Sequence, residues 1–371
     1  LASDFTSLTQ EFKDIQNANG STMNLRIGET VRRIDLLYGL LVASANDAAS
    51  VIANDVAGSL PNFVAMMNKK AQELGCENTH FANPNGLHDP QHYTSAWDMY
   101  LITKAALEYP DFLTICDTGT YTVPATNLSP ARTLHTTNFL IDTWRSRGYR
   151  NKDAHGIKTG STDAAGHCLV SSATRGSLHF ISVVLGGDRV TLEDGEIRTY
   201  SFYDTNLLFN WAFDNFAYRT ILEGKEIIQE VPVSLSKTDY VTVHPADDVE
   251  VLFPKDLNPE DLERVITLPE DQEAPITAGQ KLGTMELKDG DTSYATVDLL
   301  ASNDVEADKL MVFRHDVTLF FQKPAVRTGI VVVLVLIVLL LVLYFTRGSR
   351  RRRYGRSYRS YSSGYRGRHR R

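Results

Sequence analysis

Cysteine is scarce in this sequence of 371 residues, which contains only Cys76, Cys116 and Cys168. An odd and sparse set of this kind argues against a disulfide framework, although it leaves room for a single pair. Acidic residues are absent from the last segment, 347–371, which holds 11 arginines. The rest of the chain therefore has 27 Lys and Arg against 45 Asp and Glu, a net charge of about −18.

Motifs of phosphate-binding and common hydrolytic sites are also missing. A P-loop requires Gly-x-x-x-x-Gly-Lys-Ser/Thr between a strand and a helix. In GIKTGSTDAAGHCLV, residues 156–170, Lys158 precedes Gly160 and a second strand-like run follows, so this interpretation is set aside. No Gly-x-Ser-x-Gly occurs, which argues against a nucleophile elbow but leaves a Ser-His-Asp triad open.

No metal site is predicted. His88 and His92 have the i, i+4 spacing of helical metal ligands, but Pro90 lies between them and NPNGLHDPQH is typical of a loop. Because no helical face aligns the two rings, we expect neither a metal nor an organic cofactor.

One long hydrophobic run lies near the C-terminus. Residues 329–345, GIVVVLVLIVLLLVLYF, contain no charge and are just long enough to span a hydrocarbon core, so we predict a transmembrane helix over residues 327–346. Positive residues that flank a span stay in the cytoplasm. The chain is therefore predicted to be a single-pass cell-membrane protein with a cytoplasmic tail, 347–371, and with residues 1–323 outside. We expect the tail to bind anionic membrane lipid rather than nucleic acid.

The pattern of the chain ahead of this run changes twice. Residues 1–218 combine helical spacing in the first half with strand-like runs after Lys158, which predicts a mixed α/β domain. The hydrophobic runs 167–175 and 178–187 predict a hairpin, and a helix is expected over residues 197–216. Residues 219–323 are short alternating runs broken by Pro, Gly and Asp, which predicts a small all-β domain.

Two helices have recognisable ends. LPNFVAMMNKKAQELG places Pro61 in a first turn and Gly75 at the stop. Ser95 and Asp98 have the spacing of a capping box at the start of the next helix.

Two triplets point to acyl transfer by a serine enzyme that uses lysine. Such enzymes carry Ser-x-x-Lys, Ser-Asp-Asn and Lys-Thr-Gly. Here Ser44-Ala45-Asn46, at a predicted turn between helices, stands 114 residues before Lys158-Thr159-Gly160, on a predicted strand. Each triplet recurs by chance, but the pair in this order and these contexts is specific.

Three longer segments resemble the serine-type D-Ala-D-Ala carboxypeptidases, the low-molecular-weight penicillin-binding proteins. They are LLVASANDAASVIA, ELGCENTHFANPNGLHDPQHYTSAWDMYLI and GIKTGSTDAAGHCLVSSATR, and the likeness covers about residues 21–216. The resemblance implies a penicillin-binding, β-lactamase-like transpeptidase fold, followed by the β domain and the anchor. It also implies removal of the terminal D-alanine from peptidoglycan stem peptides through an acyl-enzyme, with β-lactams as covalent inhibitors.

The resemblance implies catalytic roles for three residues. Ser44 would relay protons between the base and the leaving amine. Asn46 would hydrogen-bond the substrate peptide, and Lys158 would place positive charge where an anion develops.

Four further residues would bind substrate. The Thr159 and Ser161 hydroxyls, with Arg198, would hold the terminal carboxylate. Gly160 would leave room for an extended peptide, and the N–H of Ser161 would donate to the tetrahedral oxyanion.

The Ser-x-x-Lys motif of the family does not occur between Leu1 and Ser44, where the nearest match, SLTQ at Ser7, ends in glutamine. Ser234 to Lys237 (SLSK) fits the pattern, but it follows the other motifs among strands of the second domain and is interpreted as a decoy. NANGSTMNLRIGETV resembles the family's segment just after the catalytic helix. We therefore expect truncation upstream of Leu1 and an inactive chain; loss of the nucleophile in the native protein is the alternative.

Two other functions remain open. One is a membrane-tethered module that binds D-Ala-D-Ala ends without cleaving them. The other is a β-lactamase, although no Glu-bearing deacylation loop of the class A type lies between the two triplets.

Overall fold

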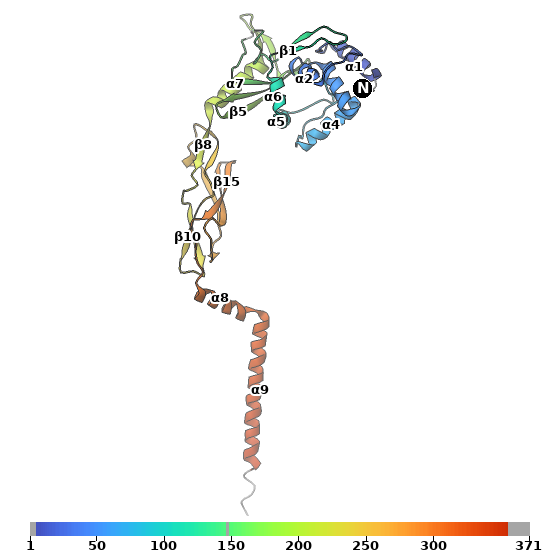
Figure 1. Cartoon of the computed structure of the whole chain (residues 1–371). Helices are drawn as coiled ribbons and strands as arrows, with labels where there is room; N and C mark the ends of the chain where they lie inside the picture. The colour runs from blue at the N-terminus through green and yellow to red at the C-terminus, as the bar shows by residue number, and fades with distance from the viewer. Residues whose placement is uncertain (1–4, 146–147, 355–371) are drawn as a thin grey trace, which may run out of the picture. The chain divides into compact units, whose positions relative to one another are not determined.

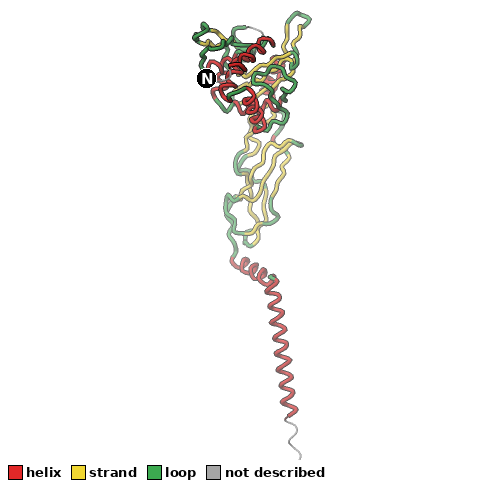
Figure 2. The backbone as a smooth tube through the Cα atoms, turned by 90° about the vertical axis from the view of Figure 1, so that its right-hand side faces the viewer, coloured by secondary structure: helices red, strands yellow, loops and turns green. Residues whose placement is uncertain are grey.

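The computed structural model describes residues 5–145 and 148–354 (Figure 1). The chain forms two compact units. The first contains Leu1–Arg219 and Leu252–Asn258, and the second contains Thr220–Val251 and Pro259–Arg371. Figure 2 shows helices and strands together in the first unit and mostly strands in the second unit ahead of its C-terminal helices. Residues 252–258, predicted to lie in the second domain, belong to the first unit.

Helices make up most of the first half of the first unit. They are α1 (Phe5–Asn17), α2 (Arg33–Val42), α3 (Asn46–Ala57), α4 (Leu60–Glu73), α5 (Ala96–Ala106) and α6 (Pro110–Cys116), with α7 (Tyr200–Asn215) near its end. The Ser59 hydroxyl accepts the Asn62 N–H at the start of α4, with Pro61 in the first turn. The Ser95 hydroxyl accepts the Asp98 N–H at the start of α5. Both predicted helix starts are confirmed.

The strands of the first unit form small antiparallel sheets. They are β1 (Thr120–Val123), β2 (Arg132–His135), β3 (Ala154–Thr162), β4 (Gly166–Arg175), β5 (Leu178–Gly187), β6 (Arg189–Thr191), β7 (Ile197–Thr199) and the start of β8 (Phe216–Leu222). A three-stranded sheet has the order β3-β4-β5, which leaves β3 at an edge. The turn between β4 and β5 passes through Gly176 at a φ of 63°, so the predicted hairpin is confirmed.

The predicted helix over 197–216 is wrong at both ends. Ile197–Thr199 form β7, which pairs with β6, and α7 runs from Tyr200 to Asn215. Partner strands supply backbone hydrogen bonds that the spacing of hydrophobic residues within one segment does not reveal.

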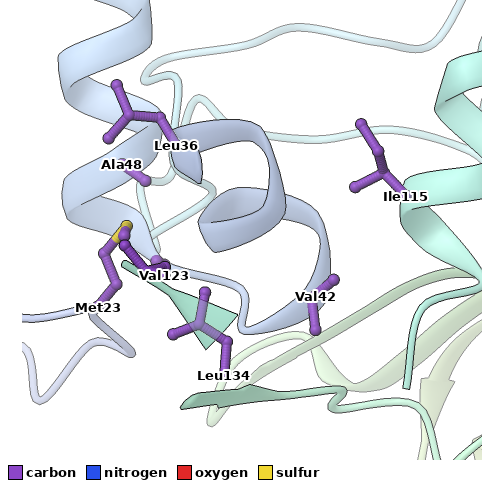
Figure 3. Close-up of a cluster of buried hydrophobic side chains, with 8 residues drawn as sticks. Met23, Leu36, Val42, Ala48, Ile115, Val123 and Leu134 are labelled. Carbon is purple, nitrogen blue, oxygen red and sulfur yellow. The ribbon is translucent and has the colours of Figure 1, made fainter. Parts of the chain in front are cut away.

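A buried hydrophobic cluster packs α2, α3 and α6 against β1 and β2 (Figure 3). Its buried members are Met23, Leu36, Val42, Ala45, Ala48, Ile115, Val123 and Leu134. Val42 and Ala45 have no exposed surface, and they flank the turn that contains Ser44. Because close-packed side chains resist displacement, the cluster fixes this turn from both sides.

The buried carboxylate of Asp47 ties the start of α3 to the preceding loop. Its Oδ1 accepts the N–H of Met23 at 3.0 Å, and its Oδ2 accepts the N–H of Leu25 at 2.9 Å. We expect Asp47→Ala to lower the free energy of unfolding by about 2–4 kcal/mol, because it strands two backbone donors and removes a favourable charge from a helix N-terminus. Chemical denaturation would measure the loss.

Asp55→Ala provides the matched control on the same helix. Asp55 pairs with Arg33, whose side chain is 83% exposed, so the loss should stay below about 1 kcal/mol. Equal losses in the two variants would contradict a specific contribution from Asp47.

The second unit is built around one mixed sheet. Its strands are the end of β8, then β9 (Gln229–Ser234), β10 (Tyr240–Pro245), the start of β11 (Val249–Pro254), β12 (Glu263–Thr267), β13 (Gln272–Glu273), β14 (Lys281–Asp289) and β15 (Thr292–Ala301), with a 3-10 turn at Pro259–Asp261. The sheet has the order β12-β14-β15-β10-β9-β13, and β8 pairs with β11. Val241 and Val243, two residues apart, are both buried, as are Met285 and Leu287. This period of two agrees with a sheet that buries one face.

Two helices follow the sheet, α8 (Lys309–Gln322) and α9 (Pro324–Tyr354). The β-rich segment was predicted to reach residue 323, so α8 is a correction. The Asp308 carboxylate caps α8 by accepting the N–H groups of Leu310 and Met311. Within α9, Pro324–Phe345 is long and apolar enough to cross a membrane, with a mean hydropathy of 3.2. Much of the predicted tail, 355–371, lies outside the described residues.

Candidate active site

A cavity of about 1080 Å³ opens within the first unit. Its walls come from segments far apart in the sequence, among them 18–21, 44–46, 85–88 and 158–164, together with Ile197, Thr199, Ser201 and Phe202. Six of the seven predicted site residues line it: Ser44, Asn46, Lys158, Thr159, Gly160 and Ser161. The two triplets predicted to act together therefore face one space.

A direct hydrogen bond joins the two triplets. Lys158 Nζ donates to Ser44 Oγ at 2.7 Å and to the carbonyl oxygen of Thr159 at 2.6 Å. Ser44 has a φ of 56°, in the left-handed region that side chains with a Cβ avoid. Such backbone strain persists only where the surroundings over-determine it, as the buried neighbours of this turn do.

The protonation of Lys158 is set by its burial. Loss of solvent lowers the pKa of Lys158 to about 8. Burial raises the pKa of Cys116 to about 12, so this thiol is neutral at physiological pH. Lys158 therefore exchanges a proton in the range where an enzyme works, at an atom in contact with Ser44 Oγ.

Asn46 is held against another wall of the cavity. Its side-chain N–H and its backbone N–H both donate to the carbonyl oxygen of Ser21, each at 2.9 Å. No described residue donates to Asn46 Oδ1. The amide can therefore accept a hydrogen bond from a ligand N–H.

The end of β3 is an open edge. Gly160 and Ser161 are exposed, whereas the Thr159 hydroxyl is hydrogen-bonded to the Thr137 hydroxyl. A Cβ at Gly160 would meet only Cys168 Cβ, at 3.9 Å, so the fold does not require glycine at this position. An edge strand of this kind can pair with an extended peptide.

Comparison with known proteins identifies the family. Residues 4–189 match the family model described as D-alanyl-D-alanine carboxypeptidase, and residues 216–307 match the model of the penicillin-binding protein 5 C-terminal domain. The chain belongs to the D-alanyl-D-alanine carboxypeptidase family.

Individual members of the family align over most of the chain. The D-alanyl-D-alanine carboxypeptidase DacF of Bacillus subtilis is 32% identical over 295 residues, which cover 79% of this chain and 72% of DacF. DacA of Haemophilus influenzae is 31% identical over 77% of this chain and 68% of DacA. The crystal structure of penicillin binding protein 5 from Haemophilus influenzae has a TM-score of 0.56 at 30% identity, over 78% of this chain and 79% of that one.

These findings confirm the predicted carboxypeptidase family, the mixed α/β penicillin-binding fold and the C-terminal β domain. They do not favour the two alternative functions, a non-cleaving binding module and a β-lactamase.

Arg198 is the predicted site residue that this member of the family does not bring to the cavity. In β7, Ile197 and Thr199 line the cavity, and Arg198 between them packs its guanidinium over the Tyr203 ring, 4.5 Å from the centroid. Alternate residues of a strand face opposite sides. The role of Arg198 in substrate binding stays a prediction.

Sequence reasoning missed a different arginine. Arg189 of β6 lies directly opposite Thr199 of β7 and lines the cavity with it. Directly opposite residues of an antiparallel pair project from the same face. The pairing of β6 with β7 is a non-local signal that motif spacing does not contain.

The one Ser-x-x-Lys pattern of the sequence, Ser234 to Lys237, lies outside this cavity. Ser234 ends β9 in the second unit, and the Lys237 side chain is 85% exposed and paired with Asp308 at 3.5 Å. The hydroxyl of Ser236 accepts the N–H of Thr238. Lys237 therefore lacks the buried surroundings and the serine contact that Lys158 has.

The described residues do not form a metal-binding site of the usual side chains. Across residues 5–145 and 148–354, no group of three or more His, Cys, Asp or Glu side chains is placed to hold an ion. The His92 ring packs edge-on against Phe81, and burial lowers its pKa.

Proposed function

We propose that this protein removes the terminal D-alanine from peptidoglycan stem peptides by serine acyl transfer. A serine oxygen attacks the carbonyl carbon of the penultimate D-alanine, the peptide C–N bond breaks, and D-alanine leaves with a proton on its amine. Water then hydrolyses the ester and restores the serine. The contact between Lys158 Nζ and Ser44 Oγ is the observation that carries this proposal, because it unites the two family triplets in one cavity.

Ser44 and Lys158 are proposed to manage the proton and the charge of this reaction. The Ser44 hydroxyl both accepts from Lys158 and can donate onward, which suits a relay to the leaving amine. The Lys158 ammonium, half-buried, stabilises the negative charge of the tetrahedral intermediate more strongly than an exposed lysine would. The nucleophile itself is assigned to none of the described residues.

Asn46 and the edge of β3 are proposed to hold the peptide. The amide oxygen of Asn46 would accept a substrate N–H, and the open edge at Gly160 would admit an extended chain. Ser161 would donate its N–H to the oxyanion, an interaction worth about 3–4 kcal/mol in comparable sites. β-Lactams would acylate the same site.

The apolar part of α9 is proposed to anchor the protein in the cell membrane. The arginine-rich segment 347–371 would remain in the cytoplasm against anionic lipid, and the first unit would face the cell wall. This topology would bring the proposed enzyme close to its substrate.

Release of D-alanine tests the proposal. The protein expressed from its native gene, with any sequence encoded ahead of Leu1, would be purified in detergent and incubated with an Nα,Nε-diacetylated Lys-D-Ala-D-Ala peptide and, separately, with a fluorescent penicillin. We expect D-alanine release and a covalent fluorescent band, and mass spectrometry of the labelled peptide would identify the acylated serine. Peptide binding without release or labelling would replace the enzyme by a binding module. Neither binding nor labelling would overturn the proposal.

A further inference from the structure

A bulge interrupts β3 just before the lysine of the cavity. The register of β3 against β4 shifts by one residue between His155 and Lys158. Gly156 and Ile157 of β3 therefore stand opposite one residue of β4, Ser171. Because successive side chains of a strand point to opposite faces, one extra residue reverses the face on which every later side chain projects. The bulge thus decides whether Lys158 points toward the cavity.

Glycine suits the first position of this bulge for two reasons. Gly156 has a φ of 51°, in the left-handed region that glycine adopts without strain. A Cβ at this position would lie 2.8 Å from the Cβ of Cys116 and 3.1 Å from its carbonyl carbon. The end of α6 therefore packs directly against the bulge, and a larger residue would displace one or the other.

The carbonyl oxygen of Gly156 accepts hydrogen bonds from two buried side chains. Ser171 Oγ donates to it at 2.6 Å, and Asn138 Nδ2 donates to it at 2.5 Å. Ser171 has no exposed surface, and Asn138 is 2% exposed. The Oδ1 atom of Asn138 accepts the N–H of Leu140, which fixes the orientation of the amide. Because a buried polar group is unfavourable without a partner, these two donors keep the bulge carbonyl in one place.

The N–H of Gly156 has a side-chain partner as well. Asp117 Oδ1 accepts it at 3.1 Å, and Asp117 Oδ2 lies 3.1 Å from Nδ1 of His155. A bulge leaves backbone groups without their usual partners in the neighbouring strand. Here the replacement partners come from the end of α6, from the segment between β2 and β3, and from β4. Three separate parts of the first unit therefore hold the same residue.

The bulge lies close to the reacting atoms along the chain. Its second residue, Ile157, is 4% exposed, so close packing leaves this part of β3 little freedom. Lys158 follows directly, and its Nζ donates to Ser44 Oγ at 2.7 Å. From Lys158 to Thr162 the pairing with β4 is regular. The bulge is therefore located where it sets the direction of the lysine side chain.

We propose that Asn138 and Ser171 are positioning residues for Lys158, because they hold the Gly156 carbonyl and so fix the bulge that turns Lys158 Nζ toward Ser44 Oγ. This inference rests on the proposed carboxypeptidase function, and it assigns to the two residues an action through Lys158 rather than a contact with substrate. Without its donors the bulge relaxes and Nζ moves away from Ser44. A misplacement of about 1 Å can lower a reaction rate about a hundredfold.

Penicillin labelling tests the proposal in the protein expressed from its native gene. Ser171→Ala should lower the acylation rate about tenfold, and Ser171→Ala with Asn138→Ala about a hundredfold. The single variant keeps the Asn138 donor to the bulge carbonyl, so we expect it to fold. A melting curve for each variant would verify that it does.

Ser182→Ala is the matched control in the same sheet. Ser182 lies directly opposite Ser171 on β5, and its hydroxyl is buried without a hydrogen-bond partner among the described residues. Removing this hydroxyl takes no support from the bulge. The labelling rate of Ser182→Ala should therefore equal that of the unmodified protein.

The titration of Lys158 supplies a second measurement that does not require acylation. Lysine labelled with 13C at Cε would be incorporated into the protein, and Lys158→Met would identify the NMR signal. Burial lowers the pKa of Lys158 to about 8, so a side chain displaced toward solvent should titrate closer to 10.5, the ordinary pKa of lysine. We expect this shift in the variant that lacks both donors. The Ser44 hydroxyl and the Cys116 thiol, which act on the ammonium, are unchanged in that variant.

The outcomes separate this inference from the proposed function. Unchanged labelling and unchanged titration in the double variant would overturn the positioning role. Slow labelling with unchanged titration and a lower melting temperature would also overturn it, because the two residues would then act on stability alone. Absence of labelling in the unmodified protein would defeat the proposed function, and the NMR titration would still decide whether Asn138 and Ser171 position Lys158.

Discussion

Lys158→Met is expected to slow acylation by a fluorescent penicillin by about a thousandfold. Methionine keeps the length and apolar stem of the side chain but removes the ammonium that contacts Ser44 Oγ. The free energy of unfolding should not fall, because a partly buried charge is replaced by an apolar group of similar volume. Labelling rates at fixed penicillin concentration, with a melting curve for each protein, would measure both effects.

The acylation rate and the stability of the unmodified protein should both depend on pH through Lys158. Lys158 loses its proton near pH 8, so acylation that needs the ammonium should decline as the pH rises through about 8. Stability should change in the opposite direction. Between about pH 8 and 10.5, the ordinary pKa of lysine, the unfolded chain holds more protons at Lys158 than the folded chain, so the contribution of this residue to the free energy of unfolding rises with pH. Both trends should vanish in Lys158→Met.

Lys152→Ala, which removes an exposed lysine just before β3, is the control. Its labelling rate should equal that of the unmodified protein. Unchanged labelling of Lys158→Met would show that the wrong lysine has been identified.

Replacement of Ser44 by glycine or alanine is expected to lower the acylation rate about a hundredfold in both variants. Each removes the hydroxyl that accepts from Lys158. Their stabilities should differ, because the φ of 56° is easily adopted by glycine and strained for alanine. We expect the glycine variant to be about 1 kcal/mol more stable than the alanine variant in chemical denaturation.

Two outcomes would contradict this interpretation of Ser44. Acylation at normal rates in both variants would remove the hydroxyl from the reaction. Mass-spectrometric labelling of Ser44 itself would make it the nucleophile rather than a relay.

Local signals in the sequence were sufficient for much of the fold and to select six residues that line one cavity. Side-chain caps at Ser59 and Ser95 act within one turn, so their spacing is visible in a single segment. The two triplets could be paired because each has a recognisable form. Arg198 was predicted as a site residue from its position after the strand pair. Because alternate residues of β7 face opposite sides, Thr199 lines the cavity and Arg198 does not.

What the sequence could not provide were relations between segments. Because β6 pairs with β7, residues 197–199 form a strand rather than the start of the predicted helix. The same pairing places Arg189 at the cavity. Such features depend on pairing and burial, which motif spacing does not encode.

The hydrogen bond between Ser44 and Lys158 closes a loop of 114 residues. Loop-closure entropy must be overcome before so distant a contact can form, and contacts of this kind slow folding. Neither a nascent chain that ends before β3 nor an isolated helical fragment can contain the assembled site. Penicillin labelling would therefore report the completion of folding as well as catalytic competence.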